Sequence, residues 1–284
     1  EDLSTLNAGT YTVLITDANG CTIADTWEIT EPDELLISEE IASHVDVLCF
    51  GENTGVIEVV VDQGSVAPYE YSITNSLGGE VEVEQVTDPT VVSYVFDELL
   101  ADTYTVTVTD ANGISKSINI TITEPAAILN IDTVVLSSHN GFNISCNGAA
   151  DGSIEITVSG GTIGYTYVWE GPSSFSAITP NISALAPGDY TITVTDDNGC
   201  AVEETYSIIE PDVLGLTGDL SDYNGFGVSG NGLSDGSIDI TVTGGAIPYS
   251  YSWTSTDGTI PGGQEIEEDL STLNAGTYTV LITD

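Results

Sequence analysis

Basic side chains are almost absent from this chain. Its 284 residues include 45 Asp and Glu residues but a single Lys or Arg, Lys116, so the formal net charge is −44 and salt bridges cannot balance it. A surface of this charge repels nucleic acids and anionic membranes, and both are excluded as partners. Cations are attracted instead, either into a diffuse solvated coat that keeps the chain soluble and extended or at discrete calcium sites.

Methionine is absent, histidine occurs twice, and there is no long hydrophobic run. Without such a run, no membrane insertion is expected in this segment. His44 and His139 have no Cys or His at metal-ligand spacing, and a phosphate-binding glycine loop and a nucleophile elbow are also missing from the sequence. Carboxylate pairs are too common in so acidic a chain to indicate a glycosidase. The sequence therefore predicts no catalytic residues, no required cofactor and a protein that is not an enzyme.

The sequence repeats itself: residues 1–17 reappear letter for letter as residues 268–284. A shorter repeat consists of a Tyr-rich segment ending in Thr-Asp before a tight turn, at Asp17, Asp110, Asp196 and Asp284. A Glu-Pro pair follows each complete turn, at Glu31, Glu124 and Glu210. We therefore divide the chain into the last two strands of one unit (1–32), two complete units (33–125 and 126–211) and a third unit that lacks its last strand (212–284).

Each unit has the strand pattern of a β-sandwich. In residues 104–109 apolar and polar side chains alternate, which puts Tyr104, Val106 and Val108 on one buried face. The Asn-Gly pair after each complete copy supplies the positive φ of a hairpin turn, and a second alternating strand follows it. Units of about 90 residues are the size of one sandwich domain. The predicted fold class is therefore all-β: tandem immunoglobulin-like β-sandwich domains in an extended array, each with its own core.

Two tryptophans end the same predicted strand in two of the units. Trp169 and Trp253 stand where immunoglobulin-like sandwiches bury a large aromatic side chain, and the third unit has Ile73 there. Core packing is favoured over ligand stacking, because an aromatic platform for a sugar would face the solvent. Trp27 lies outside this pattern, on a predicted last strand, and the sequence indicates no role for it.

Three sequence strings, taken together and in order at one period, resemble SprB-type repeats. They are Gly-Gly-x-x-Pro-Tyr-x-Tyr-x-Trp at residues 244–253, Leu-x-x-Gly-x-Tyr-Thr at residues 185–191, and Thr-Asp-x-Asn-Gly-Cys at residues 195–200. Such repeats occur in tandem in very long gliding-motility adhesins of bacteria. The resemblance implies an extracellular, surface-anchored filamentous adhesin that is exported by the type IX secretion system.

The four cysteines suggest disulfide bonds but do not give their connectivity. Each unit offers an early position (Cys49, Cys146, Gly230) and a late position (Ile114, Cys200 and the repeat of Cys21). Bonds within units would pair only Cys146 with Cys200 and would leave two cysteines unpaired. Bonds between neighbouring units would pair Cys49 with Cys200, and Cys146 with the next copy of Cys21, and would leave none. We predict that disulfides staple neighbouring domains; free buried thiols are the alternative.

Calcium sites at the domain junctions are a second hypothesis. The candidate oxygen ligands come from the turns and from the linkers before them: Asp110 and Asn112 with Glu31 and Asp33, and Asp196, Asp197 and Asn198 with Glu124. Calcium takes six to eight oxygen ligands, which a junction could assemble only from both domains. Asp-x-Asn-Gly is also an ordinary hairpin turn in which Asp and Asn bond their own backbone, and this structural interpretation is favoured.

Two functions remain open on the sequence alone. In one, the chain is a shaft that projects a distal binding tip, and its units contact only their neighbours along the same chain. In the other, it is a self-assembling extracellular filament or surface-layer component, held by lateral contacts and bridging cations.

Overall fold

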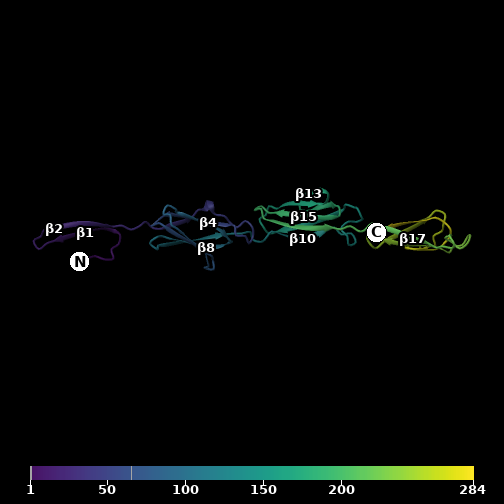
Figure 1. The fold of residues 1–284 in the computed structure, drawn as a ribbon, viewed down its shortest axis with the longest axis horizontal. Helices are drawn as coiled ribbons and strands as arrows, with labels where there is room; N and C mark the ends of the chain where they lie inside the picture. Colours follow the sequence, from purple (N-terminus) through teal and green to yellow (C-terminus); the bar gives the residue numbers. More distant parts are fainter. Residues whose placement is uncertain (1, 65) are drawn as a thin grey trace. The chain divides into compact units, whose positions relative to one another are not determined.

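The computed structural model describes residues 2–64 and 66–284, which are almost entirely β-strands joined by loops (Figure 1). The chain divides into two compact units, Glu1–Ile128 and Leu129–Asp284. Buried apolar side chains form three separate core clusters, one in the first unit and two in the second. The predicted all-β class is confirmed; the predicted domain boundaries stay predictions.

The first unit begins with a lone hairpin. Within the described part of the chain, strands β1 (Gly9–Thr16) and β2 (Thr22–Ile29) pair only with each other, from Gly9 opposite Ile29 to Thr16 opposite Thr22. Apart from the partly buried Tyr11, every residue of the two strands is exposed. The alternating pattern of this sequence is enough to form a hairpin, and among the described residues no second sheet is packed on its apolar face.

A sandwich of two sheets follows in the same unit. One sheet has the order β3 (Leu36–Glu39), β4 (Gly55–Gln63), β7 (Ser93–Leu99), and the other has the order β6 (Glu80–Val86), β5 (Tyr69–Thr74), β8 (Asp102–Thr109), β9 (Ser115–Ile122). A 3-10 turn, η1, covers Ile41–Ser43. As the alternation predicted, Tyr104, Val106 and Val108 on β8 are buried, at 3%, 0% and 0% exposure.

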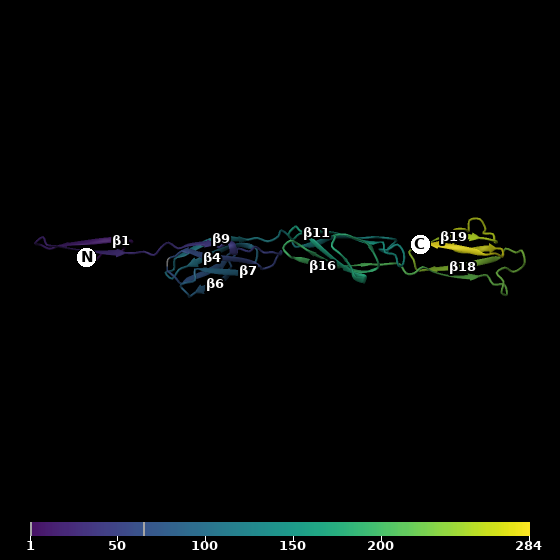
Figure 2. The same ribbon diagram turned by 90° about the horizontal axis from the view of Figure 1, so that it is seen from above.

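The second unit holds two further sets of sheets. In the first set, one sheet has the order β10 (Asn130–Leu136), β11 (Gly152–Ser159), β14 (Ile182–Leu185). The other sheet has the order β13 (Phe175–Ala177), β12 (Thr166–Gly171), β15 (Gly188–Thr195), β16 (Ala201–Ile208), and the 3-10 turn η2 lies at Pro172–Ser174. The second set consists of β17 (Gly215–Leu220), β18 (Gly236–Thr243), β20 (Leu270–Leu273) and of β19 (Ser250–Ser255), β21 (Tyr278–Thr283). Strands β18 and β19 of this last sandwich lie in different layers (Figure 2).

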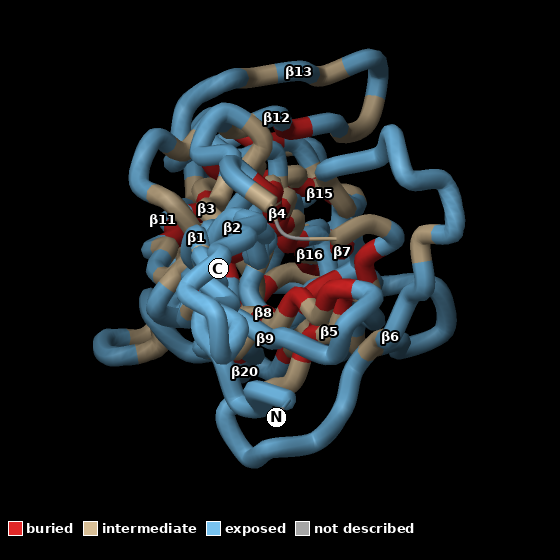
Figure 3. Tube along the Cα trace, turned by 90° about the vertical axis from the view of Figure 1, so that its left-hand side faces the viewer, coloured by how far each residue is buried: buried red, intermediate tan, exposed pale blue. Residues whose placement is uncertain are grey.

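Burial follows the alternation of the inner strands. Strand β4 alternates between buried or nearly buried residues and partly exposed ones, with Ile57 and Val59 at 0% exposure, and buried stretches of the trace are red in Figure 3. Trp169 on β12 is fully buried and Trp253 on β19 is 5% exposed. Their ring nitrogens donate to backbone carbonyl oxygens, of Thr179 at 3.1 Å and of Glu267 at 3.0 Å. Each indole therefore fills a core while its polar atom keeps a partner.

A tyrosine near the start of one strand, β8, β15 or β21, makes the same bond in each sandwich. The hydroxyl groups of Tyr104, Tyr190 and Tyr278 donate to the backbone carbonyl oxygen four residues earlier, at 2.9, 3.0 and 2.9 Å. This contact is the tyrosine corner of immunoglobulin-like domains. Together with the order of the two sheets, it identifies the sandwiches as immunoglobulin-like.

Candidate functional site

The turns between the last two strands are built around a buried aspartate. Asp110 and Asp196 are each only 5% exposed. Oδ1 of Asp110 accepts hydrogen bonds from the backbone N–H groups of Asn112, at 3.0 Å, and Ile114, at 2.7 Å. An Asp that accepts from its own turn in this way closes the hairpin. The arrangement agrees with the structural interpretation of Asp-x-Asn-Gly.

Asp196 accepts three hydrogen bonds from backbone N–H groups. Its Oδ1 accepts from the N–H groups of Asn198, at 3.0 Å, and Cys200, at 2.8 Å, and its Oδ2 accepts from the N–H of Thr162, at 2.8 Å. Burial by itself would raise the pKa of this carboxyl group, but the backbone donors, led by Thr162, outweigh it and hold the pKa below its ordinary value. Asp196 therefore stays ionised while it ties the turn to the loop before β12.

The same turn in the lone hairpin is solvent-exposed. Oδ1 of Asp17 accepts from the N–H groups of Asn19, at 2.9 Å, and Cys21, at 2.8 Å, but the residue itself is exposed. One sequence motif thus has a buried and an exposed form. Among the residues that the structure describes, a sandwich packs around Asp196 but none packs around Asp17.

The remaining predicted calcium ligands lie on the surface. Asn112, Asp197, Asn198, Glu31 and Asp33 are exposed, and Glu124 is half-buried. Across residues 2–64 and 66–284, no group of three or more His, Cys, Asp or Glu side chains is placed to hold a metal ion. The junction calcium hypothesis combines residues from neighbouring domains, and it stays a prediction.

The Glu of two Glu-Pro pairs has a partner that the sequence did not reveal. Oε2 of Glu124 accepts from the N–H of Gly51 at 2.6 Å, and Oε2 of Glu210 accepts from the N–H of Gly148 at 2.6 Å. Both glycines have positive φ, +79° and +77°, in a tight turn before strand β4 or β11. Each carboxylate therefore ties the end of its domain's last strand to the same domain's first loop.

The cysteines fall into two states. Cys49 and Cys200 are disulfide-bonded. Cys21 and Cys146 are free thiols and are exposed to solvent. The bond that would close within one unit, between Cys146 and Cys200, is therefore not formed in this structure. The pairing of Cys49 with Cys200, and of Cys146 with a further copy of Cys21, stays a prediction.

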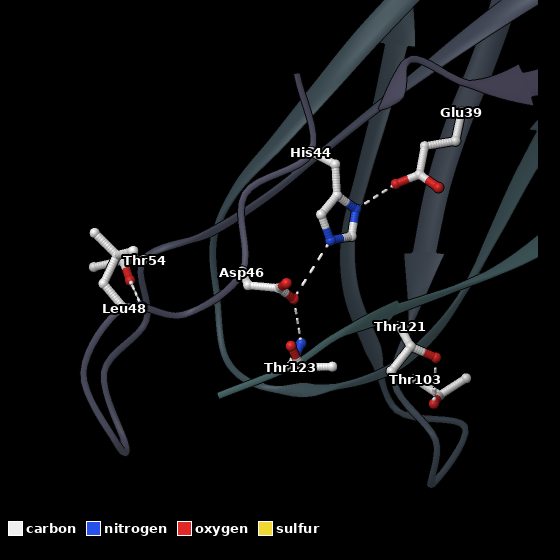
Figure 4. Close-up of polar contacts among 8 residues, drawn as sticks. All are labelled: Glu39, His44, Asp46, Leu48, Thr54, Thr103, Thr121 and Thr123. Atoms are coloured by element: carbon white, nitrogen blue, oxygen red, sulfur yellow. Dashed lines mark hydrogen bonds and ion pairs between the residues drawn. The ribbon is translucent and has the colours of Figure 1, made fainter. Parts of the chain in front are cut away.

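His44 lies between two carboxylates at the surface of the first sandwich (Figure 4). Its Nδ1 is 2.5 Å from Oε1 of Glu39, and its Nε2 is 3.4 Å from Oδ1 of Asp46. Hydrogen bonding to Glu39 is the main reason that the pKa of His44 is raised above 6.5. Oδ1 of Asp46 also accepts from the N–H of Thr123 at 2.6 Å, which is the main reason that the pKa of Asp46 is lowered. The cluster joins the segment before β4 to the residue that follows β9.

The single basic residue is on the surface. Nζ of Lys116, on β9, lies 3.5 Å from Oε1 of Glu34, and both side chains are largely solvent-exposed. An exposed pair of this kind contributes little to stability. No helix of the described residues is long and apolar enough to cross a membrane.

The SprB repeat family model matches this chain at three places, residues 41–78, 142–174 and 228–258. Each match spans the second and third strands of one sandwich, β4 and β5, β11 and β12, or β18 and β19. The predicted resemblance to SprB-type repeats is thus confirmed. No curated protein has significant similarity to the chain.

Several solved structures of tandem β-domains are distantly similar. The three N-terminal domains of the highly immunogenic outer capsid protein (Hoc) of bacteriophage RB49 are 13% identical over 80% of this chain and 76% of that one, with a TM-score of 0.37. The eight N-terminal immunoglobulin domains of Down syndrome cell adhesion molecule give 12% identity, 97% and 39% coverage, and a TM-score of 0.41. The fibronectin(III)-like modules of CbhA from Clostridium thermocellum give 10% identity, 62% and 94% coverage, and a TM-score of 0.26.

Proposed function

We propose that this chain is a structural, non-catalytic repeat region of a secreted cell-surface adhesin, and that it forms part of an extended filamentous shaft. The observation that carries the proposal is the coincidence of repeat and core. Each SprB match falls on one sandwich, and each sandwich has its own cluster of buried side chains. Domains that are stable on their own can be strung together in any number, which is what a shaft requires.

The charge supports an extracellular shaft as well. With 45 acidic residues against one basic residue, neighbouring copies repel one another, so the chain stays soluble and resists collapse. The SprB resemblance adds surface anchoring, gliding motility and type IX secretion to the proposal. In this proposal the ligand is bound by segments other than these repeats. The main partners of each repeat are its neighbours along the chain.

We assign the stiffness of the shaft to its junctions, where the bond between Cys49 and Cys200 would staple one domain to the next. The bonded state of both residues supports this assignment. Calcium bound by the turn and linker oxygens would stiffen the same hinges.

Small-angle scattering of the full chain tests the proposal. We expect a rod whose mass is independent of concentration. When Cys49 is changed to Ser, the distribution of its maximum dimension should become broader, because the rod then bends more freely. Cys146→Ser is the matched control, because it removes an exposed free thiol and leaves the bonded pair intact. Unreduced peptide mapping that joins Cys146 to Cys200 would contradict the staple.

The same measurement, made with calcium and then with chelator, separates the alternatives. A rod that bends when calcium is removed supports calcium-stiffened hinges, and a rod indifferent to calcium removes them from the proposal. Mass that grows with calcium would favour instead a filament or surface layer held by lateral contacts.

A further inference from the structure

Asn-Gly pairs recur along this chain, at Asn19, Asn112, Asn140, Asn147, Asn198, Asn224 and Asn231. Asparagine is one of the thermolabile residues of proteins, and glycine after it makes it more so, because glycine has no Cβ atom to shield its backbone nitrogen from the neighbouring side-chain amide. Whether such a pair reacts in a folded protein depends on how firmly the structure holds the glycine nitrogen and its proton.

In four of these pairs the glycine N–H has an acceptor in the fold. The N–H groups of Gly20, Gly113 and Gly199 donate to the carbonyl oxygen of the Asp three residues earlier, at 3.1, 3.0 and 3.1 Å. The N–H of Gly148 donates to Oε2 of Glu210 at 2.6 Å. A nitrogen whose proton is held in this way is not free to attack a side chain, so the structure protects these four pairs.

Two other pairs lie at the centre of matching loops, residues 139–142 and 223–226. In each loop the two residues that flank the pair exchange two backbone hydrogen bonds, at 2.7 and 3.0 Å in the first loop and at 2.8 and 3.4 Å in the second. Asn140 and Asn224 both have positive φ, +47° and +55°, and both are exposed to solvent. The chain therefore contains the same turn twice, and any difference in reactivity must come from what surrounds it.

The residue three positions before the glycine differs between the two loops. It is Asp222 in the second loop, and its Oδ1 accepts a hydrogen bond from the N–H of Gly225 at 2.6 Å. In the first loop it is Ser138, and among the residues that the structure describes the N–H of Gly141 has no acceptor. Gly141 is exposed, and no atom lies within 4 Å of the position that a Cβ atom would take on it. Solvent base can therefore reach the N–H of Gly141.

We propose that Asn140 is a site of spontaneous modification, at which the asparagine converts to isoaspartate with time. The nitrogen of Gly141 gives its proton to solvent base and forms a bond to Cγ of Asn140. The bond between Cγ and Nδ2 breaks, and the amide leaves as ammonia after taking a proton from water. A second water molecule opens the cyclic imide at either carbonyl group, which gives aspartate or isoaspartate. The net reaction consumes one water molecule and releases one ammonia.

The modified loop holds the residue that follows the last strand of its sandwich. The N–H of Asn143 donates to the carbonyl oxygen of Ile209 at 2.9 Å, and Oδ1 of Asn143 accepts from the N–H of Ile209 at 2.9 Å. Nδ2 of Asn143 donates to the carbonyl oxygen of Ser137 at 2.9 Å, and Oγ of Ser137 donates to the carbonyl oxygen of Asn143 at 2.7 Å. These four hydrogen bonds fix Ile209, directly after β16, to the loop that contains Asn140.

Isoaspartate at position 140 weakens this attachment. The main chain of isoaspartate runs through the former side chain, so it is longer by one methylene group. A two-residue turn fixes the register of the residues on either side of it, and the longer turn no longer brings His139 and Phe142 opposite each other. The position of Asn143 then shifts, and its bonds to Ile209 are lost. Because the released ammonia diffuses away, the change is irreversible, and its extent increases with the age of the molecule.

Incubation of the full chain at neutral pH tests the proposal, with peptic digestion at acidic pH and mass spectrometry to locate each modified asparagine. Asn140 should react at least about tenfold faster than Asn224, because the hydrogen bond from Gly225 to a charged acceptor must break before Asn224 can react. The rate at Asn140 should rise with pH, since the attacking nitrogen must lose its proton. If opening of the turn controlled the reaction instead, Asn224 would react faster, because one of its flanking hydrogen bonds is longer, at 3.4 Å. That order, or equal rates, would overturn the proposal.

Exchanging one residue between the loops tests the cause. Ser138→Asp supplies the missing acceptor and should slow the reaction of Asn140 by about tenfold, whereas Ser138→Ala, the matched control, should change it by less than about twofold. An equal rate in the two variants would contradict the role of the glycine N–H.

Hydrogen exchange measures the structural consequence. The N–H of Ile209 should exchange faster in proportion to the isoaspartate content of incubated protein. In Asn140→Gln, whose longer side chain closes the corresponding ring much more slowly, exchange should not change on incubation. Unchanged exchange at Ile209 in protein that contains isoaspartate would contradict the proposed loss of attachment.

Discussion

Replacing Asp196 with Ala separates the structural from the calcium-binding interpretation of the turns. The change removes the acceptor of three backbone N–H groups, those of Thr162, Asn198 and Cys200. A hydrogen bond to a charged group contributes about 1.5–3 kcal/mol. Asn198 is exposed, so water can replace its bond, whereas Thr162 and Cys200 are partly buried. We expect the variant to lose about 2–4 kcal/mol of stability in this sandwich.

Hydrogen exchange in the full chain measures this loss locally. A destabilisation of that size should speed exchange in β15 and β16 by roughly 30- to 700-fold where exchange follows unfolding equilibria. Strands β8 and β9 of the other unit provide an internal reference. Asp17→Ala is the matched control, because the same turn is exposed there, and its effect on stability should stay below about 0.5 kcal/mol.

Calcium is the second variable in this experiment. If the carboxylate only closes the turn, exchange in the unmodified chain is the same with calcium and with chelator. Unchanged exchange in Asp196→Ala would refute the structural argument. Calcium-dependent protection that the substitution abolishes would identify Asp196 as a metal ligand.

Two further predictions concern single side chains. Ile208→Ala should destabilise its sandwich by about 2–5 kcal/mol, measured by hydrogen exchange of β16, whereas Ile29→Ala, at 38% exposure, should cost less than about 1 kcal/mol. Hydrogen bonding to Glu39 raises the pKa of His44 above 6.5. The stabilisation of the folded state by this bond is therefore complete below pH 6.5 and is lost as the pH rises through the raised pKa. Unfolding of residues 33–125 followed against pH should show this loss, and His44→Gln, which cannot titrate, should remove it; an unchanged profile in that variant would assign the loss to other groups.

The strands were predictable because local pattern decides them. Alternation at residues 104–109 places Tyr104, Val106 and Val108 on one face whatever packs on it, and the structure buries all three. The Asn-Gly turns and the tyrosine positions are equally local. The SprB strings were recognisable for the same reason, since they contain the turn and strand residues of each unit.

What the sequence did not reveal depends on residues far apart along the chain. The bond from Gly51 to Glu124 joins positions 73 residues apart, and no short motif announces it. Likewise Asp17 and Asp196 have similar neighbours in sequence but differ in burial, because a sandwich of the described residues packs around Asp196 and not around Asp17.

Because Lys116 is the single Lys or Arg residue in the sequence, the chain should resist some extracellular proteases. Proteases of trypsin-like specificity cut only after Lys or Arg, so a chain of 284 residues offers them one peptide bond. That bond lies inside β9, where Lys116 is paired with Val108 of β8. A protease needs an extended, unpaired segment, so cleavage there must await local opening of the sheet. The scarcity of basic residues, which makes the chain so acidic, thus leaves trypsin-like proteases a single cleavage site, and that site is protected by strand pairing.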